Sequence, residues 1–279
     1  MAGAGGAAPR LERLTQLCAR LGICSRGEAS RYIRLGHVLV DGEVSRNVAA
    51  LVAPDAEVTL AERGQRMQAA KVTIALHKPP NYASARAAPG SPLARSLLVP
   101  ENRAPECKTR HDPRHLARLA AADVLGDQSS GLLLFSQDGR VATRISRDPD
   151  LEREYALGLP APASASQLAA LRACLSALAA EARGSAPAAG PSAGTPAEAG
   201  VARVDEDEEE DFGGPHPLRV TLRGGVADAG VHRACALAGL RGVSVARTRV
   251  GPLRLGGLPS GQWTVVSVER LLAQGSEKK

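Results

Sequence analysis

The sequence lacks long apolar runs. No stretch approaches the roughly 20 consecutive apolar residues that a membrane-spanning helix needs, and residues 1–9 lack the hydrophobic core of a secretory signal peptide. We therefore expect an intracellular protein that does not enter a membrane.

Cysteines are few, and their spacing is wrong for a structural metal site. The chain has five of them, an odd number, and none forms a C-x-x-C pair. Zinc sites and disulfide frameworks need paired or closely spaced cysteines. We therefore expect no metal and no cofactor, and the unpaired cysteines favour a reducing compartment.

Aromatic residues are also scarce, at 2% of the chain, although hydrophobic residues in total reach 44%. A core can therefore form, with alanine and glycine abundant in place of aromatic residues. The net charge is +6, even though residues 205–211 are all carboxylates. The rest of the chain is thus strongly basic, which favours a polyanionic partner such as RNA. A basic protein without a nucleic-acid partner is the alternative.

Residues 11–60 have the pattern of a small helix-helix-hairpin module. Apolar residues recur at helical spacing over 11–21. Ser25 and Glu28 then form a capping-box pattern that starts a second helix. The Asp41-Gly42 dipeptide predicts the turn of a short hairpin.

Residues 72–273 mix strand patterns with helical patterns, which is typical of an α+β domain. We expect a linker at 61–71 between the two domains. Residues 184–214 are rich in Gly, Ala and Pro and then acidic, so we expect a disordered insert there. The acidic part of this insert would bind a basic protein partner, screen an RNA-binding surface, or remain a solvated segment.

The first module resembles the small RNA-binding domain of ribosomal protein S-four. The match runs from Leu14 to Val44, and its helix caps, glycines and turn fall in register. The resemblance implies RNA binding. Arg31 and Arg34 lie three residues apart on one helical face, and Arg26 at the helix start would join them in contacting phosphates. A merely solvated face is the alternative reading of these arginines.

The rest of the chain contains, in this order, the motifs LHKP at 76–79, GLLLFSQDG at 131–139, EREY at 152–155, HRA at 232–234 and RVGPLRLGGL at 249–258. In sequence and order they resemble the motifs of the catalytic domain of the RsuA/RluB-like rRNA pseudouridine synthase family. The resemblance implies a mixed, mainly antiparallel sheet, an rRNA or ribosomal-particle partner, and a monomer. The Ala-rich insert hints at a eukaryote, and eukaryotic members of such bacterial-type families usually serve mitochondria or plastids. A mitochondrial location is therefore expected, with the cytoplasm as the alternative.

The resemblance also implies a chemistry. Members of this family isomerise uridine in RNA without a cofactor, after flipping the base into a pocket. An aspartate attacks as the nucleophile, a tyrosine stacks on the base, and a basic residue supports the aspartate. Tyr155 matches the tyrosine, and Arg153 replaces a lysine beside it. Lys78 and Arg233 would contact RNA.

The nucleophile itself is missing. In the family it lies five residues before the glycine that begins G-L-L-L, which is Gly131 here, so Gly126 occupies its position. Val124 stands where the family has a partner arginine. Two substitutes remain open: Asp127 is one residue late, and Asp123 would need a three-residue insertion. We therefore expect weak or no catalysis.

Three functions are compatible with these patterns. The first is an inactive relative, a pseudoenzyme, that binds rRNA and acts in ribosome assembly. The second is an active rRNA pseudouridine synthase that uses Asp127. The third is a general RNA-binding or assembly module that works through residues 11–60.

Overall fold

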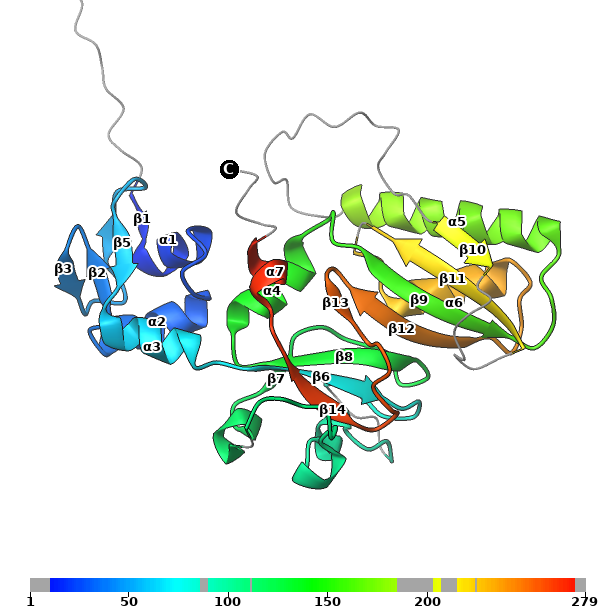
Figure 1. The fold of residues 1–279 in the computed structure, drawn as a ribbon. Coiled ribbons are helices and arrows are strands. Elements are labelled where there is room, and N and C mark those ends of the chain that lie inside the picture. The colour runs from blue at the N-terminus through cyan, green and yellow to red at the C-terminus, as the bar shows by residue number, and fades with distance from the viewer. Residues whose placement is uncertain are drawn as a thin grey trace, which may run out of the picture.

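The computed structural model describes residues 11–85, 90–110, 112–184, 203–206, 215–223 and 225–273. Within these ranges the chain forms a small N-terminal domain beside a larger sheet domain (Figure 1). This arrangement confirms the α+β class predicted from the sequence.

The small domain has the expected helix-helix-hairpin order. Its capping box is complete: the Ser25 hydroxyl accepts from the Glu28 N–H, and the Glu28 carboxylate accepts from the Ser25 N–H at 2.7 Å. Tyr32 and Ile33 lie in its core. The elements are β1 (Glu12–Arg13), α1 (Leu14–Arg20), α2 (Arg26–Arg34), β2 (Val38–Val40), β3 (Glu43–Ser45), β4 (Leu51–Val52) and β5 (Val58–Leu60).

The segment expected to be a linker, 61–71, contains a helix, α3 (Glu62–Ala69). Its side chains belong to the small domain: Met67 packs against the core, and the Tyr32 hydroxyl donates to Gln68 Oε1 at 3.0 Å. The small domain therefore extends beyond residue 60, because this helix buries one face on it.

The large domain is built on one sheet in the order β10-β11-β9-β12-β8-β6-β14, with β7 paired to β8 and β13 paired to β12. Only the β12–β8 pairing is parallel among the described strands, so the sheet is mixed and mainly antiparallel, as predicted. The strands are β6 (Thr73–Lys78), β7 (Ala120–Ala121), β8 (Ser130–Ser136), β9 (Arg153–Leu159), β10 (Arg203–Glu206), β11 (His216–Leu222), β12 (Ser244–Val250), β13 (Leu253–Arg254) and β14 (Trp263–Val266).

Four α-helices cover parts of this sheet: α4 (Gly139–Arg147), α5 (Ala165–Gly184), α6 (Asp228–Leu237) and α7 (Glu269–Ala273). Helices α5 and α6 pack on each other and on strands β9, β11 and β12 through one apolar cluster, which includes Leu157, Leu175 and Val231. Helices α4 and α7 share a second cluster with β8. Short 3-10 helices lie at Ala94–Leu97, Pro100–Asn102 and Pro113–Leu116.

The segment expected to be a disordered insert is partly folded. Strand β10 lies within it and pairs antiparallel with β11, from Arg203 opposite Thr221 to Glu206 opposite Leu218. The expectation is therefore wrong for these four residues, because Val204 adds its side chain to the apolar cluster under α5. Residues 185–202 and 207–214 of the segment lie outside the described residues.

Candidate functional site

One cross-strand row carries the polar centre of the large domain. Lys78 on β6 is opposite Gly131 on β8, Gly131 is opposite Arg247 on β12, and Arg247 is opposite Tyr155 on β9. Side chains in such a row share one face of a sheet. Gly131 has a φ of 100°, and a Cβ there would lie 2.3 Å from the Arg247 carbonyl oxygen. Glycine is therefore required where these strands approach each other.

Lys78 is fully buried at the end of β6, with 0% of its surface exposed. Its ammonium donates to the backbone carbonyls of Pro79, Tyr82 and Asp127 at 2.8–3.2 Å. Burial lowers the pKa of Lys78 to about 8, although Asp127 and Asp228 favour its charged form. In this structure the charge of Lys78 is enclosed by backbone oxygens, and its contact with RNA stays a prediction.

Two buried arginines share one carboxylate beside this row. Arg247 Nη1 donates to Asp123 Oδ2 at 2.9 Å, and Arg153 Nε lies 3.5 Å from the same oxygen. Arg247 also donates to the Leu132 carbonyl, and Arg153 donates to the Ile145 carbonyl. Arg153 thus lies where the resemblance implied a positive charge, but it is enclosed by protein.

Tyr155 lies beside these arginines with 0% of its surface exposed. Its hydroxyl donates to the Val226 carbonyl at 3.4 Å, and burial raises its pKa. The ring belongs to the apolar cluster under α5 and α6. In this conformation neither face of the ring is available for a base to stack on.

Gly126 lies in the loop before β8, next to a carboxylate from another element. The Gly126 N–H donates to Asp228 Oδ2 at 2.8 Å. The Ser129 hydroxyl donates to the same oxygen at 2.5 Å. Asp228 is the first residue of α6 and only 3% exposed, although it is 102 positions from Gly126 in the sequence.

His232 lies one helical turn beyond Asp228, and its Nε2 is 3.0 Å from the Ser129 hydroxyl oxygen. Ser, His and Asp are the residue types of a hydrolytic triad, but the order differs here. In a triad the aspartate orients the histidine, whereas Asp228 accepts directly from Ser129. Ser129 is fully buried. This trio therefore ties α6 to the loop and does not present a nucleophile.

Asp127 contributes mainly its backbone to the site. Its carbonyl accepts from the Lys78 ammonium and, at 2.6 Å, from the Asn81 N–H. The Asp127 side chain is half-buried, and within the described ranges it has no hydrogen bond or ion pair. The carboxylate that meets the two buried arginines belongs to Asp123.

The four arginines expected to bind RNA lie on exposed surfaces of two helices, and their binding to RNA stays a prediction. Arg26, Arg31 and Arg34 on α2 are all exposed. Arg233 is exposed on α6. Arg31 and Arg34 occupy the last turn of their helix, where positive charge is favoured.

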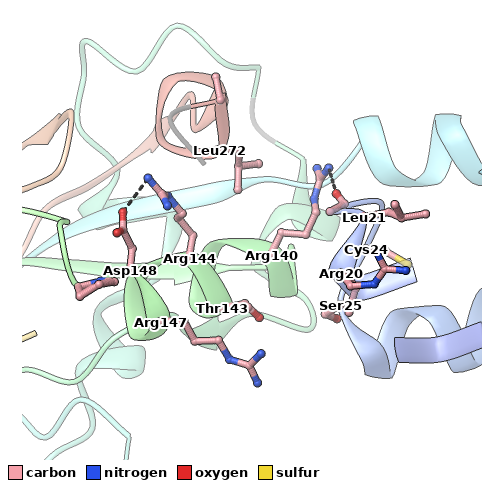
Figure 2. Close-up of a pocket in the computed structure, with 14 residues that line it drawn as sticks. Arg20, Leu21, Cys24, Ser25, Arg140, Thr143, Arg144, Arg147, Asp148 and Leu272 are labelled. Atoms are coloured by element: carbon pink, nitrogen blue, oxygen red, sulfur yellow. Dashed lines mark hydrogen bonds and ion pairs between the residues drawn. The ribbon is translucent and has the colours of Figure 1, made fainter. Parts of the chain in front are cut away.

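A pocket of about 670 Å³ lies between the two domains, lined by the end of α1, by α4 and by α7. Four arginines line it, but Arg20, Arg140 and Arg144 are each paired with a carboxylate. Figure 2 shows the Arg144–Asp148 pair and the separate side chain of Arg147. The lining therefore carries little uncompensated positive charge.

Sequence reasoning missed Asp228 and Arg247. A weak signal existed for Arg247, because an arginine in a strand needs a polar partner if it is buried, but Arg249 in the same strand carried the same signal. An acidic residue at a helix start, such as Asp228, is common and carried no such signal.

Among the described residues, no group of three His, Cys, Asp or Glu side chains is placed to hold a metal ion. No described helix has the length and apolarity to cross a membrane.

Comparison with known proteins gives matches for both domains. Residues 12–58 match the S4 domain. Over 265 residues the chain is 25% identical to the dual-specificity RNA pseudouridine synthase RluF of Escherichia coli strain K12, covering 93% of this chain and 77% of that protein. The Salmonella typhi protein of the same name is 24% identical over 262 residues, with the same coverage.

Among solved structures, a pseudouridylate synthase aligns with a TM-score of 0.48 and 19% identity, covering 93% of this chain and 97% of that one. An archaeal box H/ACA Nop10-Cbf5 complex aligns with a TM-score of 0.35 and 14% identity, covering 69% and 52%. The sequence relatives named above are bacterial, so they give no support for the mitochondrial location.

Proposed function

We propose that this chain, which carries an S4 domain and is homologous to pseudouridine synthases over most of its length, binds structured RNA without isomerising uridine. Ribosomal RNA is the proposed partner, and ribosome assembly the proposed setting. One observation carries the proposal: residue 126 is glycine, and the space beside it is filled by the Asp228 carboxylate.

The geometry of the site supports the proposed absence of catalysis. A nucleophile must lie within about 0.5–1 Å of its productive position. Gly126 has no side chain, and the Asp127 carbonyl accepts two hydrogen bonds that hold its backbone in the loop. Asp123 has a carboxylate in the centre, but Arg247 and Arg153 hold it. Tyr155 offers no exposed ring to a base.

RNA binding is supported by the small domain. Arg26, Arg31 and Arg34 form an exposed basic face on α2. Arginines so placed contact phosphates, which fixes the orientation of the RNA without reading its sequence. The relatives' names describe enzymes that act on RNA, and this chain would keep their binding function while losing the reaction.

The test is tritium release from rRNA that contains 5-tritiated uridine, with purified full-length chain and a bacterial RluF as the positive control. We expect no release above background together with measurable RNA affinity. Release that disappears in Asp127→Ala would establish the active enzyme instead. Failure to bind rRNA at moderate salt would overturn the binding half of the proposal.

A further inference from the structure

We propose that Asp228 replaces the side chain missing at position 126: its carboxylate, delivered from α6, fills the site and holds it closed against a flipped base. This inference deepens the proposed function and rests on it. Asp228 lies outside every motif that carries the family resemblance, and its role becomes visible only when α6 is placed against the loop before β8.

The first support is steric. A Cβ built on Gly126 would lie 2.7 Å from Asp228 Oδ2, a distance that real Cβ atoms essentially never show. The next heavy atoms are Asp228 Cγ at 3.7 Å and Ser129 Oγ at 3.9 Å. A side chain at 126 could therefore be accommodated only if the Asp228 carboxylate moved from its present position.

The second support is the hydrogen bonding of the carboxylate. Asp228 Oδ2 accepts from the Gly126 N–H and from the Ser129 hydroxyl. Asp228 and Ser129 are both buried, and a buried carboxylate is stable only when such donors are in place. Asp228 also begins a ten-residue helix, whose N-terminal end favours negative charge. This one oxygen atom therefore bonds two residues of the loop to the helix, and the contact of Ser129 with His232 adds to them.

The third support is the balance of charge around the site. The cations of the centre are Lys78, Arg153 and Arg247. Asp123 contacts both arginines and compensates one of their two positive charges, whereas Asp228 and Asp127 both favour the charged form of Lys78. Asp228 thus contributes negative charge to a centre in which position 126 contributes none.

The consequence is a closed site. The Tyr155 hydroxyl bonds to the Val226 carbonyl, which lies two residues before Asp228 in the segment that leads into α6. A base that stacked on Tyr155 would have to displace this segment, and the bonds of Asp228 to Gly126 and Ser129 hold the segment in place. RNA would therefore bind on the outside of the domain with its bases unflipped.

The test is a double-mutant cycle on the full chain, measured by thermal unfolding. Gly126→Ala should lower the melting temperature by roughly 3–8 °C, because the new Cβ overlaps the carboxylate. In an Asp228→Ala background, where the carboxylate is gone, the same change should cost less than about 2 °C. Equal losses in both backgrounds would show that Asp228 does not occupy the space beside residue 126, and the proposal would fall.

Two further variants keep the test decisive if Asp228→Ala unfolds. Asp228→Asn retains an acceptor oxygen and the same shape, so Gly126→Ala should remain costly in that background. In the native chain, Gly126→Asp should lower the melting temperature more than Gly126→Ala does, because the new carboxylate would lie against that of Asp228. Equal costs for Gly126→Asp and Gly126→Ala would contradict the proposal.

Failure of this inference can be told apart from failure of the proposed function. If the effects of the two substitutions on the melting temperature were additive, the proposed role of Asp228 would be wrong. RNA affinity and tritium release would still test the proposed function independently. Tritium release by the native chain that is lost in Asp228→Asn would identify Asp228 as an acting nucleophile in an open site, and would overturn the closed-site proposal directly.

Discussion

At the scale of single residues, Lys78 shows how a charge is kept where water does not reach. Three backbone carbonyls surround its ammonium and replace the lost solvent. Those carbonyls come from residues 79, 82 and 127, so the lysine joins the end of β6 to the loop that contains Gly126. The positive charge of Lys78 therefore holds the loop around Gly126 in place, whereas the same charge on a protein surface would be free to contact phosphate.

This environment predicts a pH dependence. The folded pKa of Lys78, about 8, is below the ordinary lysine value of roughly 10.4. Between these values the unfolded chain binds more protons, so the contribution of Lys78 to stability rises with pH above 8 and does not change below it. Urea unfolding at pH 7.5 and 9.5 should show a gain on the order of 1–2 kcal/mol from this group.

The comparison variant is Lys78→Met, which removes the titrating group and retains most of the apolar stem. The free energy of unfolding of this variant should therefore rise less between pH 7.5 and 9.5 than that of the native chain. If both proteins gave the same pH dependence, Lys78 would not have a lowered pKa in the folded state.

At the scale of elements, α2 has two roles. Its buried face, with Ala29, Tyr32 and Ile33, forms the core of the small domain. Its other face carries the exposed arginines. Because the two faces are separate, the basic face can be altered with little effect on folding.

The double variant Arg31→Glu/Arg34→Glu should weaken binding to rRNA by about tenfold or more at moderate salt, and should lower the slope of log affinity against log salt by about 2. Filter binding or fluorescence anisotropy over a salt series would measure both quantities. Arg63→Glu, an exposed change on α3 in the same domain, is the control. If Arg63→Glu weakened RNA binding as much as a single arginine-to-glutamate change on α2, the effect would be one of overall charge, and α2 would not carry a defined RNA-binding face.

At the scale of the whole molecule, Glu28 connects the two domains. Its carboxylate accepts from the Ser25 N–H within α2, pairs with Lys71, and accepts from the Gly139 N–H at the start of α4 at 3.1 Å. Arg140 adds a bond to the Gly22 carbonyl. The small domain is thereby oriented against the sheet domain (Figure 1).

Burial opposes the charged form of Glu28, but the hydrogen bonds from Lys71, Ser25 and Gly139 outweigh it and lower its pKa. A lowered glutamate pKa gives stability that is present above the ordinary value and is lost as pH falls through the folded value. Glu28→Gln should therefore destabilise the chain at pH 7 by about 1–3 kcal/mol and reduce its acid sensitivity.

Thermal unfolding over pH 3–7 and limited proteolysis near residues 61–71 would measure these effects. Glu62→Gln is the matched control, because Glu62 forms an exposed pair with Arg66 within α3. Such surface pairs contribute little. If the two variants behaved alike, Glu28 would not connect the domains.

The sequence alone determined what depends on near neighbours along the chain. The capping box, the hairpin of the small domain, the strand patterns and the α+β class all follow from local spacing, and the structure confirms them. The glycine at 126 was also readable from its distance to Gly131.

Only the tertiary structure decided what fills the site. Gly126 and Asp228 are 102 positions apart, and Asp123 and Arg247 are 124 apart. No periodicity relates such residues, because their meeting depends on how α6 and β12 pack against the sheet. The same reason explains α3 and β10: each is stabilised by apolar surface that belongs to another part of the chain, so local composition at 61–71 and at 203–206 gave the wrong expectation.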